Sequence, residues 1–223
     1  MNKECKVFIT DPYTCSDYLT ESKHLIEIWC KLCEVPYDQE LPELFLSKTE
    51  IDYFAPFYKL EKPIMVIHPN GGPRDQPLKY SWTRDIPSPL IKEVIDHYKN
   101  KYSIVHVKRD DQTAYENTVG AIDSFRSIAV LLMLSERRLL IDSSIMHIAA
   151  ALDLPSVVCW IGTNPKVFGY EVHANIVANP GDLELNLDHQ YLQRLPLFED
   201  ISKCPYSDLS TVFDSKTIIE ILK

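Results

Sequence analysis

The sequence predicts an α/β fold in which a parallel sheet is covered by helices on both faces. From Ile64 onward, short apolar runs alternate with amphipathic helical patterns, and parallel strands joined by crossover helices produce that alternation. The clearest unit spans 139–161, where an apolar run, a polar turn, a helix stopped by Pro155 and a second apolar run follow one another. Because open parallel sheets bind ligands at the carboxyl ends of their strands, a functional site is expected along that edge.

Short apolar runs mark the expected strands. Each has the length of an ordinary strand and is rich in aliphatic residues, as strands buried in a parallel sheet are. The runs are 6–10, 64–68, 103–107, 139–141, 157–161 and 173–177.

Apolar residues at spacings of three and four predict the helices. Thr20 or Ser22 can cap the first helix, and His24, on the same helix, could be a capping or a surface residue. Ser47 and Glu50 have the spacing of a capping box. The predicted helices are 20–33, 47 to about 58, 88–98, 124–134 capped by Ser124, the stretch between Ser143 and Pro155, and 214–222 capped by Asp214.

The chain is expected to consist of three parts. Residues 61–185 carry the repeated strands and helices and are interpreted as one Rossmann-like domain. Residues 1–60 are too short and too helix-rich for a complete α/β domain, so they are interpreted as the remnant of an N-terminal domain and its linker. Residues 186–223 are expected to be a C-terminal helical tail.

Composition limits the class of protein. The chain has 223 residues, 45% of them hydrophobic and 25% charged, as in an ordinary soluble protein. Its formal net charge of -9 argues against a nucleic-acid partner. No apolar run approaches the roughly 18 residues that span a bilayer, and the first residues lack a signal-peptide core. Scattered cysteines favour a reducing compartment, so a cytoplasmic location is expected.

Several common catalytic motifs are missing from the sequence. It contains no G-x-G-x-x-G, no P-loop, no H-E-x-x-H and no G-x-S-x-G. Cys30 and Cys33 have C-x-x-C spacing without a second pair, and they lie in an amphipathic helix, so core packing is preferred over zinc or redox chemistry. We therefore expect no bound catalytic metal.

The polar turn after the 139–141 run is the first candidate site. Asp142, Ser143 and Ser144 stand where a helix begins, and His147 follows one turn later. Amides at a helix N-terminus attract anions, and hydroxyl and imidazole groups can donate to the same anion. The competing interpretation is an ordinary helix cap with a packed histidine, and spacing alone favours the cap.

A glycine loop follows the 64–68 strand and is the second candidate. Gly71 and Gly72 allow backbone amides to approach a ligand, Asn70 precedes them and Arg74 adds a positive charge. Lys79, just beyond, can neutralise a diphosphate as a point charge. The alternatives are a surface turn and a solvated lysine.

The 108–111 loop is a third and weaker candidate. It leaves the carboxyl end of the 103–107 strand and contains Lys108 and Asp110. An acidic residue at such a position can accept hydrogen bonds from ribose hydroxyls. An ordinary charged loop is at least as good an interpretation.

Taken in order, these motifs resemble the heptosyltransferase family, glycosyltransferase family nine. The resemblance covers roughly 62–177 and rests above all on the Asp-Ser turn, His147 and the alanine-rich helix that follows. Segments that match the family are 64–69 with its glycine loop, 79–82, 141–152, 154–155 and 160–165.

The resemblance implies the C-terminal half of a GT-B architecture, the half that binds the nucleotide-sugar donor, typically ADP-heptose, with no separate cofactor. Lys79 and His147 would be the catalytic residues of this chain, and the loop at 108–111 would approach the adenosine. Residues that would contact the donor are Asn70, Gly71, Gly72, Arg74, Lys79, Lys108, Asp110, Asp142, Ser143, Ser144 and His147.

The same resemblance implies a glycan acceptor in lipopolysaccharide biosynthesis and a location in the cytoplasm or at the periphery of the inner membrane. Two features of the sequence depart from the family pattern. Ser144 replaces the family's glycine, and most of the N-terminal domain, which carries the general base, has no counterpart. A second chain or domain would supply that acceptor half. The alternatives are a non-catalytic nucleotide-sugar-binding or assembly protein, and another GT-B enzyme such as a nucleotide-sugar epimerase.

Overall fold

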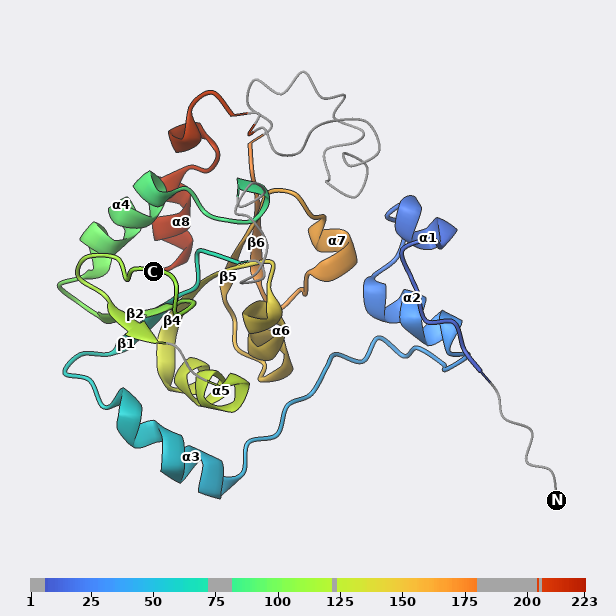
Figure 1. Cartoon of the computed structure of the whole chain (residues 1–223), viewed down its shortest axis with the longest axis horizontal. Coiled ribbons are helices and arrows are strands. Elements are labelled where there is room, and N and C mark those ends of the chain that lie inside the picture. The colour runs from blue at the N-terminus through green and yellow to red at the C-terminus, as the bar shows by residue number, and fades with distance from the viewer. Residues whose placement is uncertain (1–6, 72–81, 122–123, 180–203, 205) are drawn as a thin grey trace.

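A single six-stranded parallel sheet forms the centre of the molecule (Figure 1). The computed structural model describes residues 7–71, 82–121, 124–179, 204 and 206–223, and within them the strand order is β3-β2-β1-β4-β5-β6. The strands are β1 (Ile64–Ile67), β2 (Ser103–Val107), β3 (Val119–Ala121), β4 (Ser135–Ile141), β5 (Val157–Trp160) and β6 (Ala174–Val177).

The chain changes direction between β1 and β4. From β1 it builds outward through β2 to β3, then returns to β4 beside β1 and builds the other way through β5 to β6. Ile67 pairs with Leu139 across this centre, and the His68 amide donates to the Leu139 carbonyl at 2.8 Å. In doubly wound sheets such a switch point opens a crevice outside the carboxyl ends of the two central strands.

Helices cover both faces of the sheet, which confirms the predicted Rossmann-like α/β class. On one face, α4 (Ser88–Tyr98) and α8 (Ser215–Ile221) pack on aliphatic residues of β1, β2 and β4. On the other face, α5 (Phe125–Leu134) and α6 (Ser144–Ala151) do the same. The shorter elements are α1 (Ser16–Leu19), α2 (Leu25–Leu32), α3 (Lys48–Phe54), α7 (Pro165–Phe168), η1 (Ala55–Tyr58) and η5 (Leu209–Thr211).

Most elements after Ile64 lie where the sequence predicts them. Helix α4 and strand β2 have the predicted bounds, and the predicted caps Ser124 and Asp214 accept hydrogen bonds from the first amides of α5 and α8. The capping box of Ser47 and Glu50 is present at the start of α3. These matches follow from local rules, because periodicity and capping act over a few residues.

Three sequence predictions are corrected, and one strand was missed. Residues 7–10 form no strand, and the side chains of Val7 and Ile9 are more than 80% exposed. Helix α2 begins at Leu25 rather than near 20, because His24 is its cap. Strand β4 begins at Ser135, four residues earlier than predicted. Strand β3, which has only one buried residue, was not predicted.

The early start of β4 has a specific cause. Arg138 is only 7% exposed, and its guanidinium donates to the carbonyls of Leu132, Ser135 and Pro155. These bonds compensate the burial of a charge. A sequence rule based on apolar runs therefore excludes a residue that the sheet in fact contains.

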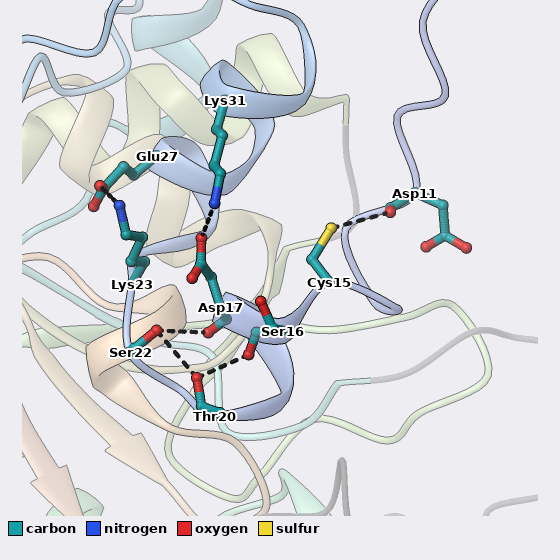
Figure 2. A network of polar contacts seen from close by, with 9 residues as sticks. All are labelled: Asp11, Cys15, Ser16, Asp17, Thr20, Ser22, Lys23, Glu27 and Lys31. Carbon is teal, nitrogen blue, oxygen red and sulfur yellow. Dashed lines mark hydrogen bonds and ion pairs between the residues drawn. The ribbon is translucent and has the colours of Figure 1, made fainter.

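Helices α1 and α2 form a hairpin that packs against α7 (Figure 1). Tyr18, Leu25 and Ile28 are buried together with Val167 of α7. Figure 2 shows the polar contacts that close the hairpin, among them the Lys31–Asp17 ion pair at 2.8 Å. The hairpin is thereby joined to the part of the sheet that carries β4 and β5.

Among the described residues, no helix combines the length and apolar character that crossing a lipid bilayer requires.

Candidate functional site

The loops after β1 and β4 meet at the switch point. Asn70 and Gly71 follow β1, and Asp142 and Ser143 follow β4. A Cβ atom on Gly71 would lie 3.0 Å from the Cδ1 atom of Ile141, the last residue of β4, so the β1 loop lies against the end of β4. The structure therefore places Asn70 and Gly71 at the same edge of the sheet as Asp142 and Ser143, although the two pairs are about 70 residues apart in the sequence.

Asp142 is held in place by the loop after β5. Its side chain is only 8% exposed, and the Thr163 hydroxyl donates to its Oδ2 atom at 2.7 Å. Asp142 also raises the pKa of His147, in opposition to burial. The Asp142 carboxylate is thus a buried and fixed group of the candidate site.

Ser143 is the N-cap of α6, as the interpretation of this turn as an ordinary helix cap predicted. Its backbone is extended, with φ -161°, and its hydroxyl oxygen accepts from the Ile145 amide at 3.3 Å. A serine cap uses one oxygen lone pair and leaves the hydroxyl proton available to an acceptor. Ser144 is the first residue of the helix and is exposed. Capping and ligand binding are therefore compatible at this turn.

His147 lies one turn into α6 and is half-buried. Its Nδ1 atom is 2.7 Å from the hydroxyl of Tyr170. Burial lowers the pKa of His147 below its usual value, and the positive end of a helix dipole acts in the same direction. At neutral pH the ring is a neutral imidazole beside the helix N-terminus, where side chains lean toward the first turn.

The polar groups of the β1 loop are bound within the protein. The Gly71 amide donates to Asp85 Oδ1 at 2.8 Å, and Asn70 Nδ2 donates to Asp85 Oδ2 at 3.0 Å. Arg109 donates from Nη1 to the Gly71 carbonyl at 2.7 Å. Burial raises the pKa of Asp85, while these donors and Arg109 lower it. The Gly71 amide can donate to a ligand only if it gives up its bond to Asp85, and the Asn70 N–H that donates to Asp85 is occupied in the same way.

Other predicted site residues lie elsewhere. Lys108 donates from Nζ to the Arg109 carbonyl at 2.9 Å and packs beside Gly120 of β3. Asp110 is exposed. The residue of this loop that reaches the β1 loop is Arg109. Gly72, Arg74 and Lys79 lie outside the described residues.

Several solved structures of glycosyltransferases are similar to this chain. A family nine glycosyltransferase from Veillonella parvula DSM 2008 matches with a TM-score of 0.58 at 12% identity, over 89% of this chain and 59% of that chain. ADP-heptose LPS heptosyltransferase II of E. coli matches with 0.49 at 20% identity, over 70% and 53%. E. coli heptosyltransferase WaaC with ADP matches with 0.46 at 15% identity, over 70% and 49%. No protein-family model and no curated protein matches the sequence.

This chain has the fold of a family nine glycosyltransferase. It spans 59% of the length of the Veillonella protein. The fold places β1, β4 and α6 at the switch point, as the motif order of the sequence had suggested. At 12% identity the similarity to the Veillonella protein concerns the fold.

Three residues of the site were missed by the sequence. Asp85 follows the glycine loop at a distance of 14 residues from Gly71, and no local pattern marks it. Tyr170 lies beyond α7 and reaches His147 across 23 residues. Thr163, in contrast, follows β5 directly, so the same strand-end rule that found Asp142 could have found it.

The geometry suits the binding of an anion. The described residues contain no group of three or more His, Cys, Asp or Glu side chains that could hold a metal ion. They do offer the first amides of α6, the hydroxyls of Ser143 and Ser144, and the ring of His147 on one turn. Such a set of donors can bind phosphate groups.

Proposed function

We propose that this chain is the donor-binding part of a glycosyltransferase that uses a nucleoside-diphosphate sugar. The observation that carries the proposal is the position of the α6 N-terminus, Ser143 and His147 directly after β4, the strand next to β1 and its loop, at the switch point of a doubly wound sheet. Nucleotides bind in that crevice in sheets of this kind. The family nine fold and the motif order support the same class of reaction.

In the proposed reaction, an acceptor hydroxyl attacks the anomeric carbon of the sugar while the bond from that carbon to the diphosphate breaks. Negative charge develops on the departing phosphate oxygen. The α6 amides, the serine hydroxyls and His147 would stabilise this charge by hydrogen bonds, and Lys79 would add a positive charge. The acceptor proton would go to a general base on another domain or chain.

The sequence resemblance suggests which substrates to try first. The donor would be ADP-linked, with a heptose as its sugar, and the acceptor a glycan of lipopolysaccharide. No separate cofactor would be needed, since diphosphate departure is assisted by protein donors. The reaction would take place in the cytoplasm or at the inner face of a membrane, where such donors and acceptors meet.

One observation favours a second candidate, a non-catalytic nucleotide-sugar-binding protein of the same fold. Asp85 accepts hydrogen bonds from both the Gly71 amide and the Asn70 side chain, and its carboxylate would repel a diphosphate at that place. A protein with this arrangement could hold a donor weakly on the α6 side without positioning it for transfer.

Isothermal calorimetry with ADP, UDP and GDP, in the presence of a chelator, tests the proposal. Binding of one nucleotide in the micromolar range is expected, with no requirement for metal. An absence of binding of all three at millimolar concentration would rule out a donor site.

Chromatographic assay of donor hydrolysis and sugar transfer then separates the two candidates. The test uses the chain alone and the chain mixed with a separately expressed N-terminal domain of a family nine enzyme. Turnover in either sample supports the glycosyltransferase. Binding of the donor with no turnover in either sample supports the non-catalytic binding protein.

A further inference from the structure

Tyr170 makes a hydrogen bond and a ring contact to His147, and the proposed reaction assigns no role to this tyrosine. Its hydroxyl lies 2.7 Å from His147 Nδ1, and the two rings meet edge to face at a centroid distance of 5.4 Å. Tyr170 is only 6% exposed. Among the described residues, Nδ1 is the one hydrogen-bond partner of this hydroxyl.

The direction of this hydrogen bond follows from its surroundings. Burial raises the pKa of Tyr170 to about 12, so the hydroxyl keeps its proton at neutral pH. A buried hydroxyl proton without an acceptor is costly, and Nδ1 is the acceptor within reach. Tyr170 therefore donates to Nδ1, and the proton of the neutral imidazole must lie on Nε2.

The tyrosine is itself held by its neighbours. His24 and His173 pack their rings against it at 5.4 and 6.1 Å, and Asn175 and His173 donate to its backbone carbonyl. His24 also bonds to the Gly169 carbonyl at 2.9 Å, which joins α2 to the residue before Tyr170. The tyrosine is thus held by two separate segments of the chain, the start of α2 and residues 173–175.

We propose that Tyr170 is a positioning residue that holds His147 in the Nε2–H tautomer, so that Nε2 donates to a phosphate oxygen at the N-terminus of α6. The proposal rests on the proposed function for its ligand. Nε2 is then the atom of His147 that meets the diphosphate, and the Tyr170 hydroxyl is the group that keeps the proton on Nε2. A neutral imidazole in the other tautomer would present a lone pair to the anion and repel it.

The Tyr170→Phe variant removes the hydroxyl and keeps the ring. Tyr98→Phe is the matched control, because Tyr98 is also buried and donates its hydroxyl to a backbone carbonyl, that of Ile219, away from the site. Nitrogen-15 NMR of the histidine rings reads the tautomer in the ligand-free protein. We expect one Nε2–H tautomer for His147 in the wild type and in Tyr98→Phe, and a mixed population in Tyr170→Phe.

Calorimetry with ADP provides the second readout. Tyr170→Phe should weaken ADP binding about fivefold, as the loss of one hydrogen bond predicts, while Tyr98→Phe leaves it unchanged. His147→Gln places an amide N–H near the position of Nε2 and needs no tyrosine. In that background, the Tyr170→Phe change should have no further effect on affinity.

The outcomes separate this proposal from the proposed function. If ADP binds and depends on His147, but Tyr170→Phe changes neither tautomer nor affinity, the positioning role is wrong and the donor site stands. If the wild type binds no nucleotide, the donor site fails. An Nδ1–H tautomer in the wild-type protein would overturn the positioning role in either case.

Discussion

The two loops that meet at the switch point use their polar groups differently. On the β4 side, the Ser144 hydroxyl and the His147 Nε2 atom have no partner among the described residues, and Ser143 uses its hydroxyl oxygen only as an acceptor for the Ile145 amide. On the β1 side, the Gly71 amide and the Asn70 side chain are both bonded to Asp85. Both loops follow a central strand and both carry residues suited to phosphate. Only the contacts that they make in the folded chain distinguish them.

This difference shows why position at a strand end is not enough to assign a ligand contact. A backbone amide is available to a ligand only if the protein has not already satisfied it. The α6 side is organised for binding in advance, whereas the β1 side would have to give up an internal carboxylate. We therefore expect the α6 side to provide most of the affinity for a diphosphate.

The largest expected effect concerns the support of the α6 side. A Cβ atom on Gly169 would lie 2.7 Å from the Pro165 carbonyl oxygen and 3.1 Å from the Trp160 ring, both of them held in place. Gly169→Ala should lower the free energy of unfolding by about 3 kcal/mol, as overpacking against backbone does. Chemical denaturation measures the loss.

Gly120 provides the control on the other side of the sheet. A Cβ atom there would lie 3.0 Å from the flexible end of Lys108 and at an ordinary contact distance, 3.6 Å, from the Cβ atom of Ala114, so Gly120→Ala should change the stability by less than about 1 kcal/mol. Equal losses in the free energy of unfolding of Gly169→Ala and Gly120→Ala would mean that the two ends of the sheet are packed equally tightly. The proposed difference between them would then be wrong.

The second prediction compares the two sides directly. His147→Ala should weaken ADP binding by about 2 kcal/mol, roughly 30-fold, because it removes a hydrogen bond to a charged group. Asn70→Ala should change the affinity by less than about twofold, since its side chain is bonded to Asp85. Calorimetry on both variants is the measurement. The reverse order of effects would place the diphosphate on the β1 loop.

Sequence patterns predicted the fold better than the site. Alternating apolar runs identified β1, β2, β5 and α4, because each buries an aliphatic face of its own. They missed β3, in which Val119 and Gly120 are exposed, and the charged start of β4, where Arg138 is buried by hydrogen bonds to carbonyls.

In the site, the strand-end rule correctly grouped Asp142 and Ser143 with the β1 loop. It could not find Asp85 or Tyr170, whose roles come from hydrogen bonds to residues distant in the sequence. Propensity, capping and periodicity are local properties, whereas the pairing of a buried polar group is decided by the folded chain. The assignment of ligand contacts therefore needs the structure.

The third prediction concerns pH. His106 of β2 is 1% exposed, and neither ring nitrogen has a partner among the described residues. The histidines of the α6 side differ, since His147 and His173 each have a hydrogen bond. Burial lowers the pKa of His106 to about 4 from the usual 6.5, so the unfolded chain binds its proton first as the pH falls.

Stability from His106 is therefore present above about pH 6.5 and is lost between that value and about pH 4. From pH 7 to pH 5 the loss should be about 1.5 kcal/mol from this residue. His106→Leu should remove that part of the pH dependence, while His97→Gln, at an exposed position, should not. Urea denaturation at both pH values decides. An unchanged slope in His106→Leu would show that the imidazole is already satisfied in solution.

The smallest expected effect tests the reason for the difference between the loops. Asp85→Asn keeps the shape of the side chain and its acceptor for the Gly71 amide, and Asn70 can turn its amide to accept from the new N–H₂ group. Removal of the negative charge should tighten ADP binding about fivefold, or about 1 kcal/mol, if a phosphate approaches this loop. Asp96→Asn, an exposed change of the same charge on α4, is the control for long-range effects and should leave the affinity unchanged. Weaker binding in Asp85→Asn would show instead that the carboxylate holds the β1 loop in its binding conformation. In that case the internal contacts of Asp85 would be part of the site, and the β1 side would be as well prepared for the ligand as the α6 side.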